Sequence, residues 1–109
     1  VYGGGDPVEL CRKYPERITY VHIKAFDEDI TREAHEKDWP FGEAVTKGAS
    51  VCPPAGLPEM QEFVDALAAL DKPIYAICEQ DCYPCDPSFP KQNAINMRTY
   101  LAECGLGLA

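Results

Sequence analysis

The sequence lacks long hydrophobic runs, a secretory signal and an excess of basic residues. No stretch approaches the roughly 18 apolar residues of a membrane span. The opening VYGGGDP has neither the charged n-region nor the apolar h-region of a signal peptide. Lys and Arg number 10 against 18 Asp and Glu, so the net charge is -8, and no basic cluster is available to neutralise phosphates. We therefore expect a soluble, cytoplasmic protein that binds neither membranes nor nucleic acid.

Length limits the chain to one domain. Its 109 residues, 46% of them hydrophobic, are enough for one useful core. The sequence does not begin with Met, and YGGGD has the composition of a loop. We therefore expect residues 1–109 to be a fragment of a longer protein.

Six cysteines are present, and no signal segment places them in an oxidising compartment. Cys11, Cys52 and Cys104 are far from any paired spacing, whereas Cys82 and Cys85 form a CxxC motif. Reduced thiols are favoured over a disulfide framework.

The first part of the chain predicts a helix followed by a strand. Asp6 can cap a helix, Pro7 suits its first turn, Glu9 can reach back, and Pro15 ends it after about Tyr14. The β-branched and aromatic residues 18–26 then predict a strand. Residues 27–56 have no clear period, and we expect a long binding loop with at most a short helix over 30–36.

The second part repeats this order. Apolar residues at helical spacing predict a buried helix that opens at Pro58 and runs to about Leu70. A strand is expected over 74–79, and a last helix over 90–104 that Gly105 can cap.

The resulting αβαβα order predicts an α/β fold with a parallel strand pair, since a crossover helix joins the two strands. Two strands cannot close a parallel sheet, because such sheets are covered by helices and contain several more strands. The chain is therefore expected to be a piece of a larger α/β protein.

Polar residues gather where both strands end. In the first strand Tyr20, His22 and Lys24 share one face, while Val21 and Ile23 share the other. Alternation in the second strand likewise puts Tyr75, Ile77, Glu79 and Asp81 on one face, away from Ala76, Cys78 and Gln80. An imidazole and a carboxylate thus reach the same end of neighbouring strands, as at the mouth of a barrel.

Taken singly, His22 or Glu79 reads as a structural group, and Lys24 as an exposed cation. Together, imidazole and carboxylate suit a divalent metal such as zinc, manganese or cobalt, but such sites need three or four protein ligands. Lys24 beside them could stabilise a developing oxyanion.

Three stretches resemble one known family. YGGGDPVELCRKYPERITYVHIKAFD, FGEAVTKGASVCPP, and IYAICEQDCYPCDP with the last helix ending YLAECGLG are similar to the C-terminal part of the sugar phosphate isomerase/epimerase family. This is the xylose-isomerase-like TIM barrel group that includes inosose dehydratases. The resemblance covers nearly the whole chain and rests on the order and spacing of short motifs.

The resemblance implies that residues 1–109 are the C-terminal αβαβα segment of a (β/α)8 TIM barrel. The parent would be a metal-dependent isomerase, epimerase or dehydratase of a sugar or cyclitol, with Mn, Co, Mg or Zn as cofactor. His22 of HxK and Glu79 of EQD fall on metal-ligand positions, and Glu79 and Lys24 are candidate catalytic residues, with Lys24 also contacting substrate.

Two departures bear on this assignment. Ala25 stands where related dehydratases have Asp after HxK, so Asp27 either substitutes or that role is absent. The other metal ligands of the family would lie upstream of Val1, in the N-terminal part of the barrel that should partner this chain.

The CxxC motif leaves other readings open. A thiolate at a helix start after a strand suits a redox pair, although the surrounding order does not match such folds. Cys78, Cys82 and Cys85 could also begin a structural zinc site with Cys104 or His35 as the fourth ligand. A non-catalytic interaction domain is the remaining alternative.

Overall fold

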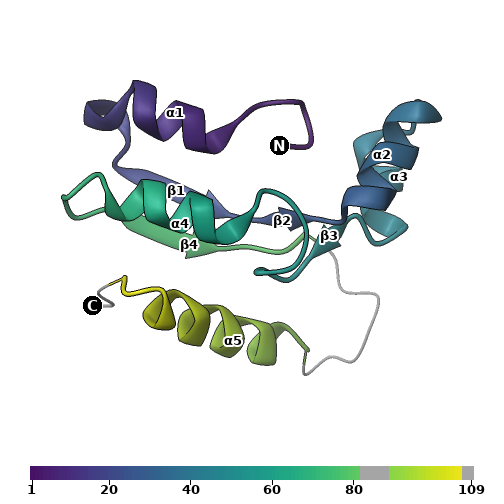
Figure 1. Ribbon diagram of the computed structural model, residues 1–109. Helices are drawn as coiled ribbons and strands as arrows, with labels where there is room; N and C mark the ends of the chain where they lie inside the picture. The colour runs from purple at the N-terminus through teal and green to yellow at the C-terminus, as the bar shows by residue number, and fades with distance from the viewer. Residues whose placement is uncertain (82–88, 107–109) are drawn as a thin grey trace.

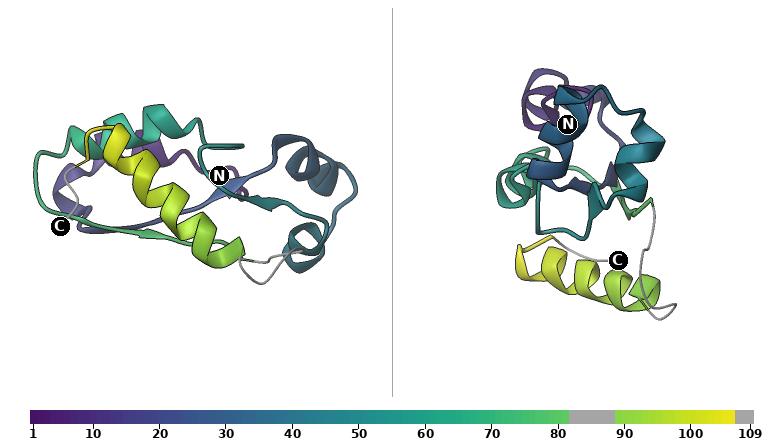
Figure 2. Two further views of the ribbon diagram at one scale, coloured as in Figure 1. Left: turned by 90° about the horizontal axis from the view of Figure 1, so that it is seen from below. Right: turned by 90° about the vertical axis from the view of Figure 1, so that its right-hand side faces the viewer.

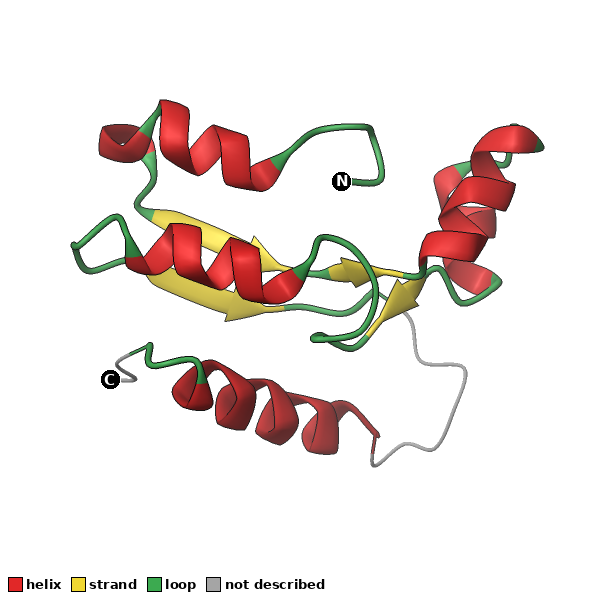
Figure 3. Ribbon diagram, viewed as in Figure 1, coloured by secondary structure: helices red, strands yellow, loops and turns green. Residues whose placement is uncertain are grey.

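Two strands of this mixed α/β chain form a parallel pair. The computed structural model describes residues 1–81 and 89–106. Strands β1 (Tyr20–Ile23) and β4 (Tyr75–Cys78) run parallel, with Tyr20 opposite Tyr75 and Ile23 opposite Cys78 (Figure 3). The predicted parallel pair is confirmed. No helix of the described residues has the length and apolar character to cross a membrane.

Helix α1 (Pro7–Lys13) begins where its capping residues predict. The Asp6 carboxylate accepts hydrogen bonds from the backbone N–H groups of Val8 and Glu9, at 2.8 and 3.0 Å, which satisfies two otherwise unpaired donors. The helix ends before Tyr14, and a 3-10 turn, η1 (Pro15–Arg17), leads into β1.

The first strand is shorter than predicted. The expected strand over residues 18–26 is divided at Lys24 into β1 and a two-residue strand β2 (Ala25–Phe26). Strand β2 pairs antiparallel with β3 (Ser50–Val51), and so belongs to a second small sheet. The alternation ends here because Ala25 and Phe26 are both buried, one in each of two hydrophobic clusters.

The segment over residues 27–56 is more ordered than predicted. It contains helices α2 (Glu28–Glu36) and α3 (Phe41–Thr46), which lie together beyond the strand ends (Figure 2). The short helix expected over 30–36 is therefore present and longer, whereas α3 and β3 were missed. These elements surround a small core made by Phe26, Ala34, Ala44 and Ala49.

Helix α4 (Met60–Ala68) lies between β3 of the second sheet and β4 of the first. It begins two residues later than predicted, with Glu59 as its cap, because Leu57 still pairs with Phe26 through two backbone hydrogen bonds of 2.7 and 2.9 Å. Its inward residues Met60, Phe63, Val64 and Leu67 are buried, as predicted.

Helix α5 (Phe89–Glu103) completes the main core (Figure 1). Its Met97 and Leu101 join a cluster that includes Ile23, which is fully buried. Gly105 follows the helix with φ of +84°, so the predicted glycine cap is confirmed.

The other face of the β1–β4 pair is uncovered by the described residues. Tyr20, Tyr75 and Ile77 are 53%, 77% and 40% exposed there. Large exposed apolar surfaces of this kind mark sites of contact with other protein.

Candidate active site

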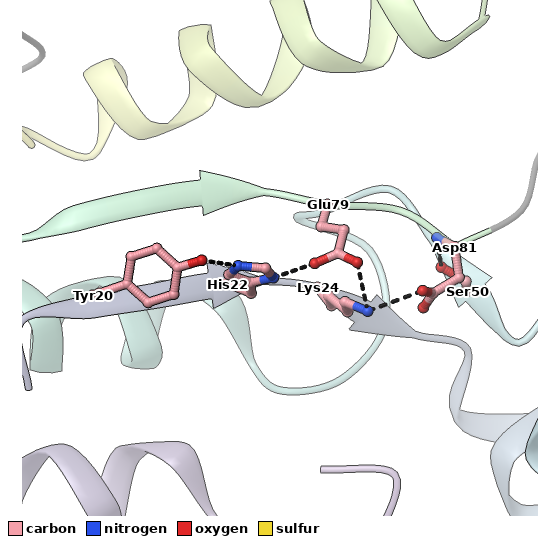
Figure 4. A network of polar contacts seen from close by, with 6 residues as sticks. All are labelled: Tyr20, His22, Lys24, Ser50, Glu79 and Asp81. Carbon is pink, nitrogen blue, oxygen red and sulfur yellow. Dashed lines mark hydrogen bonds and ion pairs between the residues drawn. The ribbon is translucent and has the colours of Figure 1, made fainter.

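His22 and Glu79 lie together at the carboxyl ends of β1 and β4. His22 lies opposite Ile77 in the register, and the backbone N–H of Glu79 extends the ladder by donating to the Ile23 carbonyl at 3.1 Å. Both side chains therefore emerge at the carboxyl ends of parallel strands, on the face opposite the main core (Figure 4).

The His22 imidazole has a polar partner on each side. Its Nδ1 contacts Glu79 Oε2, and its Nε2 lies 2.5 Å from the Tyr20 hydroxyl. The predicted convergence of His22 and Glu79 is confirmed, although their functional roles remain predictions.

Lys24 lies between two carboxylates. Its Nζ is 3.1 Å from Glu79 Oε1 and 2.9 Å from Asp81 Oδ1. The hydrogen bond to Asp81 raises the pKa of Lys24 most, and the bond to Glu79 adds to it, while partial burial opposes both. Lys24 therefore stays an ammonium cation near neutral pH and can donate hydrogen bonds.

Glu79 is held as a carboxylate. The hydrogen bond from Lys24, followed by that from His22, lowers the pKa of Glu79 below its ordinary value. A lowered pKa keeps the group ionised, as an anionic ligand must be, and makes it a weaker base.

Asp81 and Ser50 belong to the same network but were not predicted as site residues. The Asp81 backbone N–H donates to Ser50 Oγ at 3.3 Å, while its Oδ1 accepts from Lys24. The alternation from Glu79 to Asp81 placed Asp81 on the correct face. Ser50 gave no signal, because it comes from the segment without a clear period.

Asp27 does not join this network. Its carboxylate accepts from the backbone N–H of Ile30 at 2.9 Å and caps α2. Asp27 therefore has a structural task here, and the structure does not support the expectation that it could substitute for an acid at position 25.

Gln80 points away from His22, as the alternation predicts. Its amide nitrogen donates to the Ser50 carbonyl at 3.4 Å, and its Oε1 accepts from Asn93, a buried residue of α5. The Cys52 thiol contacts the same Asn93 side chain. This link ties the last helix to the strand end that carries Glu79.

His22 and Glu79 fit two positions of a divalent metal site. An imidazole nitrogen and a carboxylate oxygen face each other, and this donor pair suits zinc, manganese or cobalt. Within residues 1–81 and 89–106, no group of three or more His, Cys, Asp or Glu side chains could hold a metal ion. A metal ion held by His22 and Glu79 would need further ligands from outside these residues.

The thiols do not form a site in the described residues. Cys11, Cys52, Cys78 and Cys104 are free. Burial raises the pKa of Cys78, at the end of β4, which disfavours a reactive thiolate. Cys82 and Cys85 lie outside the described residues.

Inosose dehydratases and a rhizopine catabolism protein are among the known proteins that this chain resembles. The chain is 31% identical over 103 residues to an inosose dehydratase of Clostridium tetani, covering 94% of this chain and 34% of that protein. It is 31% identical over 111 aligned positions to the rhizopine catabolism protein MocC of Rhizobium meliloti, with 99% and 34% covered. An inosose dehydratase of Geobacillus kaustophilus is 32% identical over 84 residues, with 77% and 27% covered.

The chain spans about a third of the length of the curated relatives it matches. No protein-family profile matches it, and no solved structure does. These relatives do not support a CxxC redox enzyme or a structural zinc module.

Proposed function

We propose, since this chain belongs to the sugar phosphate isomerase/epimerase family, that it is the C-terminal part of a (β/α)8 barrel enzyme acting on a sugar or cyclitol. The relatives named inosose dehydratase favour a keto-cyclitol as substrate and loss of water as the reaction. Isomerisation or epimerisation of a sugar shares the same first step, removal of the proton next to a carbonyl.

The uncovered face of β1 and β4 supports the barrel. In this proposal the remaining strands, which lie upstream of residue 1, cover Tyr20, Tyr75 and Ile77 and turn that face into the barrel interior. The C-terminal ends of β1 and β4 then lie at the mouth, where the active sites of such barrels are built.

His22 and Glu79 are proposed to hold a divalent metal through Nδ1 and a carboxylate oxygen. When bound, the ion supplies positive charge that polarises a carbonyl and eases removal of the neighbouring proton. Because Lys24 and His22 both lower the pKa of Glu79, we assign Glu79 first as a ligand and only second as a base.

Lys24 is proposed to contact the substrate oxygen that becomes negative. Its Nζ carries a full charge and already lies at the mouth, 3.1 Å from Glu79 Oε1. A fixed cation stabilises an oxyanion most strongly where water is excluded, as it would be inside a closed barrel. For dehydration, a base takes the proton next to the carbonyl, and the hydroxyl on the following carbon receives a proton back from that base and leaves as water.

The observation that carries this proposal is the contact of His22, Glu79 and Lys24 at the carboxyl ends of two parallel strands. It is tested in the full-length protein by following dehydration of an inosose together with bound metal. His22→Ala and Glu79→Gln should each lose metal and reduce turnover more than about a hundredfold, since even outer partners of metal ligands contribute about 10–100-fold.

The matched control is His35→Gln, which changes the other histidine, an exposed residue of α2. Its turnover and metal content should equal those of the unmodified protein. Full activity of His22→Ala, or zinc bound only through thiols, would refute the proposal.

A further inference from the structure

Tyr20 contributes a hydroxyl to the candidate site, and no role was predicted for it from the sequence. Its Oη lies 2.5 Å from His22 Nε2, the ring nitrogen that faces away from Glu79. Within the described residues, this nitrogen is the only hydrogen-bond partner of that hydroxyl. The two side chains are two residues apart on one strand, so alternation puts them on the same face.

The two rings also pack against each other. The centroids of Tyr20 and His22 are 5.1 Å apart, with an interplanar angle of 56°. The imidazole is therefore held by ring contact as well as by its two polar partners. Tyr75, which lies opposite Tyr20 in the register, has a hydroxyl with no hydrogen-bond partner among the described residues, so the contact is specific to Tyr20.

A hydroxyl suits this position because it can both donate and accept a hydrogen bond. When His22 carries its proton on Nδ1 and donates to Glu79, Nε2 is an acceptor and the Tyr20 hydroxyl donates to it. When Nδ1 must offer its lone pair to a cation, the proton lies on Nε2, and the Tyr20 hydroxyl accepts a hydrogen bond from that N–H. A carboxylate or carbonyl at this place could only accept.

We propose that Tyr20 is a positioning residue for His22. The Tyr20 hydroxyl holds the imidazole of His22 with Nδ1 directed at Glu79 in both tautomers. Partners of this kind orient metal-binding histidines, and losing one reduces metal affinity about 10–100-fold. The inference rests on the proposed function, because it concerns the same pair of ligands.

The test measures binding of Co²⁺ alone, without substrate, to the full-length protein by titration calorimetry. Tyr20→Phe removes the hydroxyl and keeps the ring that packs on His22. Its Co²⁺ affinity should fall about tenfold or more. The thermal unfolding midpoint of the metal-free protein should be unchanged, which separates positioning from a general role in stability. Tyr75→Phe is the matched control and should bind Co²⁺ normally.

Equal Co²⁺ affinity of Tyr20→Phe and the unmodified protein would overturn the inference and leave the proposed function standing. An equal loss in Tyr75→Phe would also overturn it, because the effect would then belong to the whole face. If the unmodified protein binds no Co²⁺, or His22→Ala binds it as tightly, the proposed function fails as well.

If Tyr20→Phe does not fold, Tyr20→Leu and Tyr20→Trp provide the same comparison. Each of these variants lacks the hydroxyl. The variant that folds should show the weakened affinity for Co²⁺.

Discussion

Lys24 Nζ lies 2.9 Å from Asp81 Oδ1, and this contact places the cation beside the carboxylate of Glu79. Glu79 and Asp81 follow the end of β4 and lie on the same face, while Lys24 follows β1. Ser50 of β3 supports Asp81 from the second sheet, so three segments of the chain hold one ammonium group in place. Lys24 is 28% exposed in its side chain, which leaves its cation accessible at the edge of the strands.

Replacing Asp81 by Asn in the full-length protein should lower turnover about tenfold without changing metal affinity. Hydrogen bonds to charged groups contribute about 1.5–3 kcal/mol, and Asn keeps the shape while removing the charge that holds Lys24. The check is a double-mutant cycle with Lys24→Met. If Asp81 acts through Lys24, adding Asp81→Asn to Lys24→Met should cause no further loss.

Glu43→Gln is the control for this cycle, because it removes the acid from the exposed Lys47–Glu43 pair, 3.6 Å apart. Its turnover should be unchanged. Losses that simply add in the double variant would show that Asp81 acts independently of Lys24.

The pKa of Glu79 predicts how the stability of the metal-free protein depends on pH. Because folding lowers this pKa below 4.5, the contacts of Glu79 contribute stability above pH 4.5, and this contribution disappears as pH falls through the lowered value. Glu79→Gln should therefore unfold more easily than the unmodified protein at pH 7, and the gap should close in acid. Chemical denaturation of both proteins from pH 7 into acid measures this difference in the free energy of unfolding. A difference that grows in acid would contradict the contacts assigned to Glu79.

Gly56 should tolerate no side chain. Its φ is +77°, and a Cβ there would lie 2.3 Å from the Phe26 carbonyl oxygen. Gly56→Ala should lower the free energy of unfolding by about 2 kcal/mol or more, from the left-handed backbone and the steric conflict together.

Gly42→Ala serves as the comparison for Gly56, since a Cβ there meets nothing within 4 Å and the residue lies inside α3. That change should leave stability equal or raise it by about 0.5–1 kcal/mol. Denaturant titration of both variants in the full-length protein measures the difference. Equal effects would show that the Phe26–Leu57 pairing does not depend on Gly56.

The parts of this fold that obey local rules were predictable from the sequence. Asp6 and Pro7 identify the start of α1, and the alternation of Val21 and Ile23 with His22 identifies which face of β1 is buried. The same alternation brought His22 and Glu79 together, because both lie at the ends of strands joined by a crossover helix.

The other parts depend on contacts between distant residues. The break at Lys24 occurs because Phe26 packs into a second cluster with residues of α2 and α3. Helix α3 has only six residues and contains Gly42, so it has no clear helical period. Ser50 reaches Asp81 across 31 residues of sequence, and spacing rules cannot reveal that contact.

Cys82 and Cys85 should be dispensable for catalysis. The relatives named as dehydratases do not support a thiol redox reaction or a structural zinc site at these cysteines. Replacing both cysteines by Ser in the full-length protein should leave most of the turnover. A loss of about a hundredfold with the fold retained, equivalent to about 2.7 kcal/mol in the barrier, would instead give the CxxC motif a catalytic role.

The isolated chain of 109 residues should have no dehydratase, isomerase or epimerase activity. Its described residues offer two proposed ligands, His22 and Glu79, where a divalent metal site takes three or four from the protein, so Co²⁺ should bind far more weakly than in the full-length protein. Its β1–β4 face also exposes Tyr20 and Tyr75, at 53% and 77%, which favours self-association of the isolated chain. The measurements are inosose turnover, Co²⁺ titration and light scattering on the purified chain, each beside the full-length protein.

Adding the upstream part of the barrel as a separate chain should suppress the association and restore Co²⁺ binding, because it supplies the missing strands and ligands. Turnover by the isolated chain at the rate of the full-length protein would show that two ligands suffice, and the barrel assignment of the site would then be wrong.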